Sequence, residues 1–299
     1  MLYILYNPKA NCGKDTDSVL ENVKEYYSGR ELTLLDITEI DDIKAYFGAL
    51  KDTDEVVLVG GDGTLNVLCN KLRGFELKNN LYLFKAGTGN DFLRDIDNGQ
   101  DDNAKAILIN EYIENLPVVT INNKEYLFIN NVGYGIDGQV CTVADEMKAQ
   151  GKTDINYTTL SIKLLLTKYK SCGATVTAGN KRRKFKKVWL APVMNGLYYG
   201  GGLMPCPQQD RNSTEISCCA MHNCCSLKAL MIFPSIFKGK HINKKKNITV
   251  MSADEITVEF DSPRDVQIDG EVIRDVTVIK AKKYKTATQR DEKLKKATV

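Results

Sequence analysis

Three of the four residues that follow a short apolar run are glycines, and few folds place a glycine-rich turn directly after a buried strand. The run is Val56–Val59, and the stretch VGGDGTLN covers residues 59–66. Leucines then recur at helical spacing, at Leu65, Leu68 and Leu72. A buried strand that ends in such a turn and leads into a helix presents backbone N–H groups at the helix N-terminus, which attract phosphate. The pattern predicts a phosphate-binding loop in an α/β domain.

The residues of this loop indicate a nucleotide accompanied by a metal ion. Gly60, Gly61 and Gly63 permit positive φ angles and a close approach of the backbone to a nucleotide. Thr64 is expected to cap the helix and to reach a nucleotide oxygen. Asp62 would repel phosphate unless a cation lay between them, so it predicts Mg²⁺. The alternative is a simple tight turn, because Asp-Gly is a common turn pair. The loop has neither the Walker A nor the GxGxxG pattern.

Apolar runs alternate with helical periodicity through about the first 115 residues, which is typical of an α/β domain. The predicted strands are Leu2–Tyr6, Leu32–Asp36, Val56–Val59 and Leu81–Phe84. The predicted helices carry apolar residues along one face, and they cover residues 19–27, 43–50, 65–72 and 104–112. Pro117 ends the last of these helices.

Strand-like segments dominate beyond Pro117 and indicate a β-sandwich. They are Val118–Ile121, Tyr126–Asn130, Ala174–Ala178, Phe185–Val193, Glu215–Ala220, Asn247–Met251, Glu255–Phe260, Asp265–Ile268 and Val272–Ala281. Two helices are predicted, over Thr158–Lys170 and over Leu227–Phe237, where Pro234 should kink or break the helix. We therefore predict an α/β domain with a parallel-rich sheet over residues 1–117 and a β-sandwich domain over residues 118–281. The tail, residues 282–299, is either disordered or a helix that packs back on the first domain.

Composition and charge limit the binding partners and the cellular compartment that can be expected for this chain. The net charge of +3 is too small to predict nucleic-acid binding, but basic residues cluster at 181–187 and 238–246. No apolar run approaches the ~20 residues of a membrane span, and no signal-peptide pattern begins the chain, so a cytoplasmic protein is expected. The nine cysteines include SCCAMHNCC at 217–225, which lacks the CxxC spacing of zinc sites. Packing in the core is favoured over metal or redox chemistry.

Several stretches, taken together and in order, resemble one known family. They are NPKANCGK at 7–14, GGDGT and Asn66 in the glycine loop, AGTGNDFLRD at 86–95, INNVGYGIDGQV at 129–140, GGGLMP at 200–205, GKH at 239–241 and VQIDGE at 266–271. The chain resembles the diacylglycerol kinase-type lipid kinases over about residues 3–281. The resemblance is greatest to the soluble bacterial diacylglycerol and lipid kinases, which are related to sphingosine and ceramide kinases.

The resemblance implies an ATP site in a cleft between the two domains. The residues expected to border the nucleotide are Asn7, Lys14, Thr38, Gly60, Gly61, Gly63, Thr64, Asn66, Thr88 and Asn90. Asp62 is expected to hold Mg²⁺, directly or through water, and so to be required for catalysis. Asn90 and Asp91 fit equally well as residues that shape a turn or cap a helix.

The stretch VQIDGE implies the catalytic base, which is Glu271 with Asp269 as its partner or substitute. A primary hydroxyl is a poor nucleophile, and a carboxylate within hydrogen-bond reach can accept its proton. The preceding strand and Gly270 predict a turn that brings both carboxylates toward the cleft. The alternative is a hairpin turn, for which Asp-Gly is a favoured pair.

Two positions depart from the pattern of the family. Thr120 or a neighbour stands where many relatives carry an acidic residue that is linked to Mg²⁺ through water. Arg211 replaces the glycine of an Asp-Gly pair that helps relatives to bind a structural Mg²⁺. Here that second metal site would consist of Asp210, the carbonyl of Pro207 and Asn212. A simple polar turn is the equal alternative.

The function expected first is ATP-dependent phosphorylation of the free hydroxyl of diacylglycerol, which gives phosphatidic acid. The lipid is expected between the sheets of the second domain. The basic stretches would hold the enzyme on the anionic inner face of the membrane, although solvated loops are the alternative. Other functions left open are a kinase of a sphingoid base or of phosphatidylglycerol, an NAD-kinase-like kinase, and a non-catalytic nucleotide- or lipid-binding regulator. The oligomeric state is also open, a homodimer included.

Overall fold

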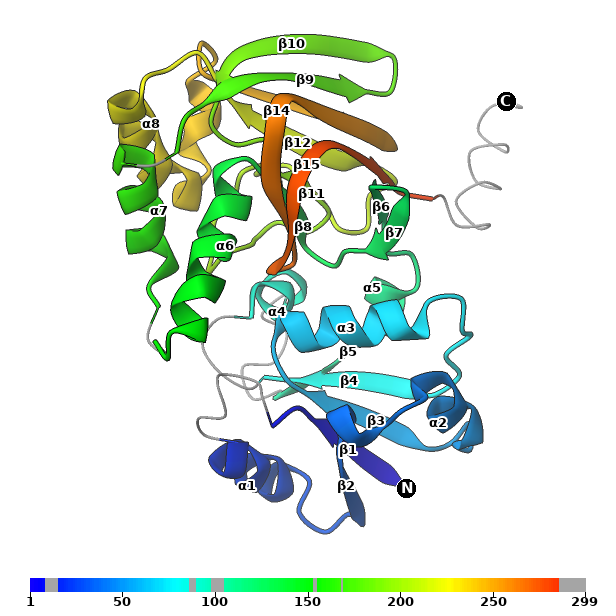
Figure 1. Cartoon of the computed structure of the whole chain (residues 1–299). Coiled ribbons are helices and arrows are strands. Elements are labelled where there is room, and N and C mark those ends of the chain that lie inside the picture. The colour runs from blue at the N-terminus through cyan, green and yellow to red at the C-terminus, as the bar shows by residue number, and fades with distance from the viewer. Residues whose placement is uncertain (9–15, 86–89, 98–104, 153–154, 168, 285–299) are drawn as a thin grey trace, which may run out of the picture. The chain divides into compact units, whose positions relative to one another are not determined.

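The computed structural model describes residues 1–8, 16–85, 90–97, 105–152, 155–167 and 169–284 (Figure 1). The chain divides into two compact units, Met1–Ile113 and Glu114–Val299. The sequence placed this division after Pro117. The tail beyond residue 284 lies outside the described residues, so the prediction for it stays untested.

Unit 1 is built on a five-stranded sheet in the order β2-β1-β3-β4-β5. Its strands are β1 (Leu2–Tyr6), β2 (Leu32–Asp36), β3 (Glu55–Val59), β4 (Asn80–Phe84) and β5 (Ala106–Leu108). The first four are parallel to one another, and β5 is antiparallel to β4. Four consecutive residues of β3 are buried, as expected for a parallel strand that is covered on both faces.

The helices of unit 1 lie between these strands along the chain, except for the last one, which follows β5. They are α1 (Thr16–Tyr26), the short 3₁₀ helix η2 (Ile37–Glu39), α2 (Ile43–Ala49), α3 (Asp62–Leu72), α4 (Asp91–Ile96) and α5 (Asn110–Ile113). In the sheet register Tyr6 pairs with Val59, and Val59 pairs with Phe84. The loops that follow β1, β3 and β4 therefore leave the same edge of the sheet.

The helix predicted over residues 104–112 is wrong. Residues 106–108 form β5, which pairs with Tyr82, Leu83 and Phe84, and only α5 is helical. The open edge of β4 offers backbone hydrogen bonds to a short apolar segment, and this long-range pairing overrides the local helical spacing.

Unit 2 contains a ten-stranded, antiparallel sheet. Its strands are β6 (Val118–Ile121), β7 (Lys124–Leu127), β8 (Asn131–Tyr134), β9 (Cys172–Ala178), β10 (Lys181–Val188), β11 (Val193–Met194), β12 (Ile216–Met221), β13 (Ile248–Ala253), β14 (Glu255–Ile268) and β15 (Glu271–Lys282). The two strands predicted between residues 255 and 268 are one continuous strand. Of the strand predicted over Tyr126–Asn130, only the first two residues lie in β7, and the other three connect β7 to β8.

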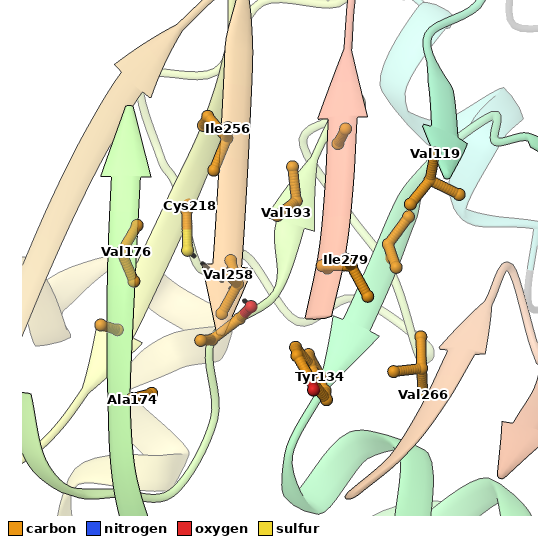
Figure 2. Close-up of a cluster of buried hydrophobic side chains, with 14 of the residues drawn as sticks. Val119, Tyr134, Ala174, Val176, Val193, Cys218, Ile256, Val258, Val266 and Ile279 are labelled. Atoms are coloured by element: carbon orange, nitrogen blue, oxygen red, sulfur yellow. Dashed lines mark hydrogen bonds between the residues drawn. The ribbon is translucent and has the colours of Figure 1, made fainter. Parts of the chain in front are cut away.

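The long strand β14 holds this sheet together. Its first half, Ile256–Phe260, pairs with β9, and its last residues, Val266–Ile268, pair with β8. On its other side it pairs with β15. Figure 2 shows buried side chains from β6, β8, β9, β11, β12, β14 and β15 gathered in one core. This arrangement is the β-sandwich-like core expected from the sequence.

Three helices and two 3₁₀ segments cover a second apolar cluster of unit 2. They are α6 (Ile136–Ala149), α7 (Tyr157–Thr167), α8 (Ser226–Ile232), η3 (Phe233–Lys238) and η4 (Lys240–Asn243). The predicted break at Pro234 is confirmed, because α8 ends two residues before it. Cys219 and Cys224 pack in this cluster and Cys218 packs in the sheet core, whereas Cys225 is exposed.

The sequence missed α6, and Gly138 explains how closely this helix packs. A Cβ at Gly138 would overlap the carbonyl oxygen of Asp265 and lie 2.7 Å from the nitrogen of Val266 in β14. Backbone atoms of a central strand cannot move aside, so only glycine fits here.

Replacing Gly138 with alanine should therefore lower the melting temperature strongly, in spite of the better helix propensity of alanine. Gly48→Ala in α2 is the matched control. Among the described residues its Cβ would meet only Phe75, at 3.8 Å, so this change should be neutral or stabilising by up to about 1 kcal/mol. Equal melting curves for the two variants would contradict the close packing. Thermal unfolding followed by circular dichroism makes the comparison.

Candidate active site

The glycine loop of unit 1 joins β3 to α3, and the N-cap residue of this helix has no side chain that could cap it. The N-cap residue is Gly61, and α3 begins at Asp62. The prediction that Thr64 caps this helix is wrong, because Thr64 lies inside the first turn and is buried. Its Oγ1 accepts a hydrogen bond of 3.1 Å from Nδ2 of Asn7, which follows β1. The N-terminus of α3 thus keeps the character of an anion site.

The glycines of the loop serve two purposes. A Cβ at Gly60 would lie 2.7 Å from Cβ of Thr64, so this glycine permits the packing of the threonine. A Cβ at Gly61 or Gly63 would meet nothing within 4 Å, among the described residues. The backbone at these two positions is therefore open to a phosphate, and side chains there would occupy that space. The loop fits a nucleotide.

Asp62 ties the first turn of α3 to the first turn of α4. Its Oδ2 accepts the N–H of Asp91 at 3.0 Å, and its Oδ1 accepts the N–H of Phe92 at 3.3 Å. Oδ1 of Asn90 accepts the N–H of Leu93 at 3.2 Å and caps the same helix. The side-chain oxygen of Asn90 thus caps a helix, which was the alternative role considered for this residue. Its Nδ2 is buried without a hydrogen-bond partner in the described part of the chain.

Other predicted nucleotide residues lie in varied surroundings. Asn66 is buried in α3, and its Oδ1 accepts a hydrogen bond of 3.1 Å from Asn70. Thr38 is exposed in η2, where its N–H and hydroxyl both donate to Oδ1 of Asp36 at 2.7 Å. Lys14 and Thr88 lie outside the described residues, so their roles stay predictions.

In unit 2 the predicted base motif forms the turn between β14 and β15. Asp269 and Gly270 have φ angles of 47° and 102°, which a two-residue hairpin turn requires. The carboxylate of Asp269 accepts three backbone N–H groups, from Ile129 at 2.6 Å, Asn130 at 2.9 Å and Asn131 at 3.0 Å. Glu271 is exposed at the start of β15. The alternative prediction, that Asp-Gly forms a hairpin turn, is thus correct for the backbone. The carboxylate of Asp269 is held by backbone N–H groups, whereas Glu271 is exposed.

Arg211 holds the same segment from its carbonyl side. The guanidinium is buried, and it donates to the carbonyl of Ile129 at 2.5 Å and to Oδ1 of Asn130 at 2.7 Å. Nζ of the buried Lys283 donates to Oδ1 of Asn195 at 2.8 Å and to the carbonyl of Arg211. In the sequence Arg211 stood out only as a departure from the family pattern. No local sequence pattern predicted its hydrogen bonds to residues 129 and 130.

The loop around Asp210 is organised as a polar turn. Oδ1 of Asp210 accepts the N–H of Asn212 at 2.9 Å, and the buried Gln209 amide donates to three carbonyl groups nearby. Pro207 is partly buried beside it. Among the described residues no three His, Cys, Asp or Glu side chains form a metal-binding group. The second metal site, and the effect of Thr120 in β6, stay predictions.

Asp137 is a buried acid at the N-terminal end of α6, which sequence reasoning did not single out. Its Oδ2 has no hydrogen-bond partner within the described residues. Burial raises the pKa of Asp137 from 3.8 to about 7, while a hydrogen bond from Tyr199 lowers it in part. Burial raises the pKa values of tyrosines 169 and 199 and of cysteines 141 and 219, and the negative charge of Asp137 raises them further.

Stability should depend on pH through this group. The folded protein keeps the proton of Asp137 up to about pH 7, whereas the unfolded chain releases it near pH 4. The contribution to the free energy of unfolding is thus complete below about pH 4 and is lost as the pH rises to about 7. Asp137→Asn should be more stable than the wild type at pH 8, and the difference should close toward pH 5. Urea unfolding at both pH values tests this, and a constant difference would contradict it.

Comparison with known proteins gives the same two-part division. Residues 1–121 match the model of the diacylglycerol kinase catalytic domain. Residues 130–284 match the model of the YegS C-terminal NAD kinase beta sandwich-like domain. Both matched segments follow one another along the chain, as the ordered motifs predicted.

Individual relatives are distant. A protein of Staphylococcus carnosus (strain TM300), provisionally named a lipid kinase, is 25% identical over 228 residues, which cover 75% of this chain and 72% of the relative. A diacylglycerol kinase of Mycobacterium tuberculosis (strain ATCC 25618 / H37Rv) is 26% identical over 64% of this chain and 62% of its own length. A crystal structure from Bacillus anthracis str. Sterne, provisionally called a diacylglycerol kinase, has a TM-score of 0.67 at 20% identity and covers 95% of this chain and 92% of its own. At that identity the likeness shows the fold.

The fold, the glycine loop and the two domain matches define a kinase whose acceptor is a lipid. The chain belongs to the diacylglycerol kinase family of lipid kinases. Membership implies ATP as the phosphoryl donor. The family and the fold class predicted from the sequence are confirmed.

Proposed function

We propose that this lipid kinase transfers the γ-phosphoryl group of ATP to the free hydroxyl of diacylglycerol and so forms phosphatidic acid. The observation that carries the proposal is the glycine loop. Its helix begins after an N-cap glycine, and a Cβ at Gly61 or Gly63 would meet no described atom within 4 Å, which suits the phosphates of a nucleotide. The diacylglycerol kinase catalytic domain that matches residues 1–121 favours this acceptor over the other lipids. The meeting of both units around the nucleotide stays a prediction.

Asp62 is the residue proposed to hold Mg²⁺. It stands in the first turn of α3, next to the proposed phosphate site, and carboxylate oxygens are ligands that Mg²⁺ prefers. The ion, when bound, neutralises charge that develops on the transferred phosphoryl group. Asp62 also fixes the start of α4 through the N–H groups of Asp91 and Phe92, so one side chain would couple the shape of both nucleotide loops to the metal.

Glu271 is the residue proposed to accept the proton of the lipid hydroxyl. Both carboxylate oxygens of Asp269 already accept backbone N–H groups, which suits a residue that positions the turn. Glu271 is exposed at the beginning of β15 and lies two residues along the same hairpin. The two carboxylates would then have separate roles. Asp269 would hold the hairpin in place, and Glu271 would accept the proton of the substrate hydroxyl.

The test is a transfer assay with labelled ATP, Mg²⁺ and a panel of acceptors in mixed micelles: diacylglycerol, sphingosine, phosphatidylglycerol and soluble NAD. Labelled phosphatidic acid is the expected product. Label in another lipid would keep the lipid kinase and replace the proposed acceptor. Labelled NADP would contradict the proposal.

We also propose reversible association with an anionic membrane surface, because the substrate is a membrane lipid and basic residues cluster at 181–187 and 238–246. No helix within the described ranges is long and apolar enough to cross a membrane. Sedimentation with anionic vesicles should weaken as salt rises from low to physiological concentration, since ions screen the attraction. Salt-independent binding to neutral vesicles would contradict an electrostatic contribution.

A further inference from the structure

We infer that the outer face of α7 and α8 is the surface that docks on an anionic lipid bilayer, with apolar side chains inserted between the lipids. This face is defined by Lys163, Leu166, Leu227, Lys228 and Met231. The inference rests on the proposed lipid substrate, and it adds an apolar contact to the electrostatic attraction expected from the basic stretches.

The first observation is that α8 is apolar on both of its faces. Ala229 and Ile232 are buried in the second core cluster. On the other side Leu227 and Met231, four residues apart, are 61% and 64% exposed. A helix on the surface of a soluble protein normally turns polar residues outward, so this helix has an apolar face that the described residues leave exposed.

The neighbouring helix has the same character. Leu164 and Leu165 of α7 are buried in the cluster that also holds α8, whereas Leu166 is 53% exposed. Lys163 lies one helical turn before Leu166 and is exposed as well. The two helices pack against each other, and Figure 1 shows them together at the margin of unit 2. Their exposed leucines and methionine thus belong to adjacent elements.

Charge identifies the partner. No acidic residue occurs between Glu215 and Asp254, although this segment contains Lys228 and the basic stretch 238–246. Exposed lysines beside exposed leucine and methionine match a bilayer whose headgroups are anionic and whose interior is apolar. Lysine stems can extend along the apolar layer and leave the ammonium group among the headgroups.

The other basic stretch lacks this combination. Residues 181–187 lie in β10, which pairs with β9 and with no other strand of the described residues, and so forms an edge of the sheet. Phe185, the only apolar residue of that stretch, is buried. Arg182 pairs with Glu259 at 3.4 Å, and Lys184 lies 3.7 Å from Asp261. Lysines on an edge strand also prevent pairing with other sheets, so this stretch offers positive charge without an apolar contact.

The test uses the full chain with Leu227→Gln and Met231→Gln combined, because glutamine keeps helix propensity and removes the apolar surface. The control combines Val250→Thr and Val278→Thr, two valines that are 40% and 41% exposed on strands β13 and β15. Vesicles of phosphatidylcholine with phosphatidylglycerol are sedimented with each protein at low and high salt. The α8 variant should bind at least about tenfold more weakly at high salt, while the control should bind like the wild type.

An exposed thiol gives a second measurement. Cys225 is the N-cap residue of α8 and is exposed. An environment-sensitive fluorophore on the protein thiols should shift to shorter wavelength when the same vesicles are added. This shift should be much smaller in labelled Cys225→Ser, which identifies the label on α8 as its source.

Activity separates this inference from the proposed function. With diacylglycerol in detergent micelles the α8 variant should turn over like the wild type, and with vesicle-embedded diacylglycerol it should be slower. If no lipid is phosphorylated by either protein, the proposed function fails while the binding comparison still decides the docking surface. Unchanged vesicle binding by a variant with a normal melting temperature overturns the inference. So does a wild-type dimer that the α8 changes split, because the face then binds a second copy.

Discussion

Replacing Asp62 with asparagine is expected to lower lipid phosphorylation by about a thousandfold or more. A metal ion at the phosphates supplies several kcal/mol of charge stabilisation, and an amide does not hold Mg²⁺ there as a carboxylate does. The asparagine oxygen can still accept one of the two N–H groups, of Asp91 and Phe92, that the aspartate accepts. The fold should therefore survive with a slightly lower melting temperature. Initial rates with labelled ATP, together with thermal unfolding without nucleotide, measure both effects.

Asp42→Asn is the matched control for the structural part of this change. Oδ1 of Asp42 caps α2 by accepting the N–H of Ala45 at 3.0 Å, so the same exchange perturbs the start of a different helix. It should cost up to about 1 kcal/mol and leave turnover intact. Near-native turnover in Asp62→Asn would show that the metal role is misassigned.

The two carboxylates of the β14–β15 turn are expected to fail in different ways when each is replaced by its amide. Glu271→Gln should lose about 10²–10⁴-fold in turnover with an unchanged melting temperature, because it removes a proton acceptor from an exposed position. Asp269→Asn should be destabilised by about 2 kcal/mol or more, because an amide nitrogen would then face an N–H group that the carboxylate accepts. ATP binding should persist in Glu271→Gln.

Asp275→Asn provides the control, since Asp275 also has a positive φ, of 56°, in the same hairpin and is exposed. It should change neither activity nor stability by more than about 0.5 kcal/mol. Rates, isothermal titration with ATP and unfolding curves are measured for all three proteins. Full activity in both Glu271→Gln and Asp269→Asn would exclude this motif as the source of the base.

Local patterns predicted much of unit 1 because its central strands are continuous apolar runs. β1 and β2 lie where the sequence placed them, and β3 and β4 differ from prediction by one residue at their starts. The segment 104–112 failed because its strand pairing is decided by β4, outside the segment. α6 was missed because Gly138 is a poor helix former that β14 requires.

The site was predictable to a similar extent. The glycine loop and the turn at Asp269 have local signatures in Asp-Gly pairs and glycines. The contacts of those two aspartates have no local signature, because they join residues far apart in the sequence. Asp62 accepts hydrogen bonds from residues 91 and 92, and Asp269 accepts them from residues 129–131. The buried contacts of Arg211 likewise join distant parts of the chain. Partner choice at such separations depends on the completed fold and leaves no local periodicity.

On the ribosome, the two units should become able to fold at very different times. Every strand of the first sheet has been made by residue 108, so that unit can form while translation continues. The second sheet has to wait for β14, which joins β8 to β9 and begins only at residue 255. Until then a nascent chain carries strands whose edges lack their partners and invite association with other chains. Chains stalled before residue 255 should therefore depend on chaperones and be readily degraded.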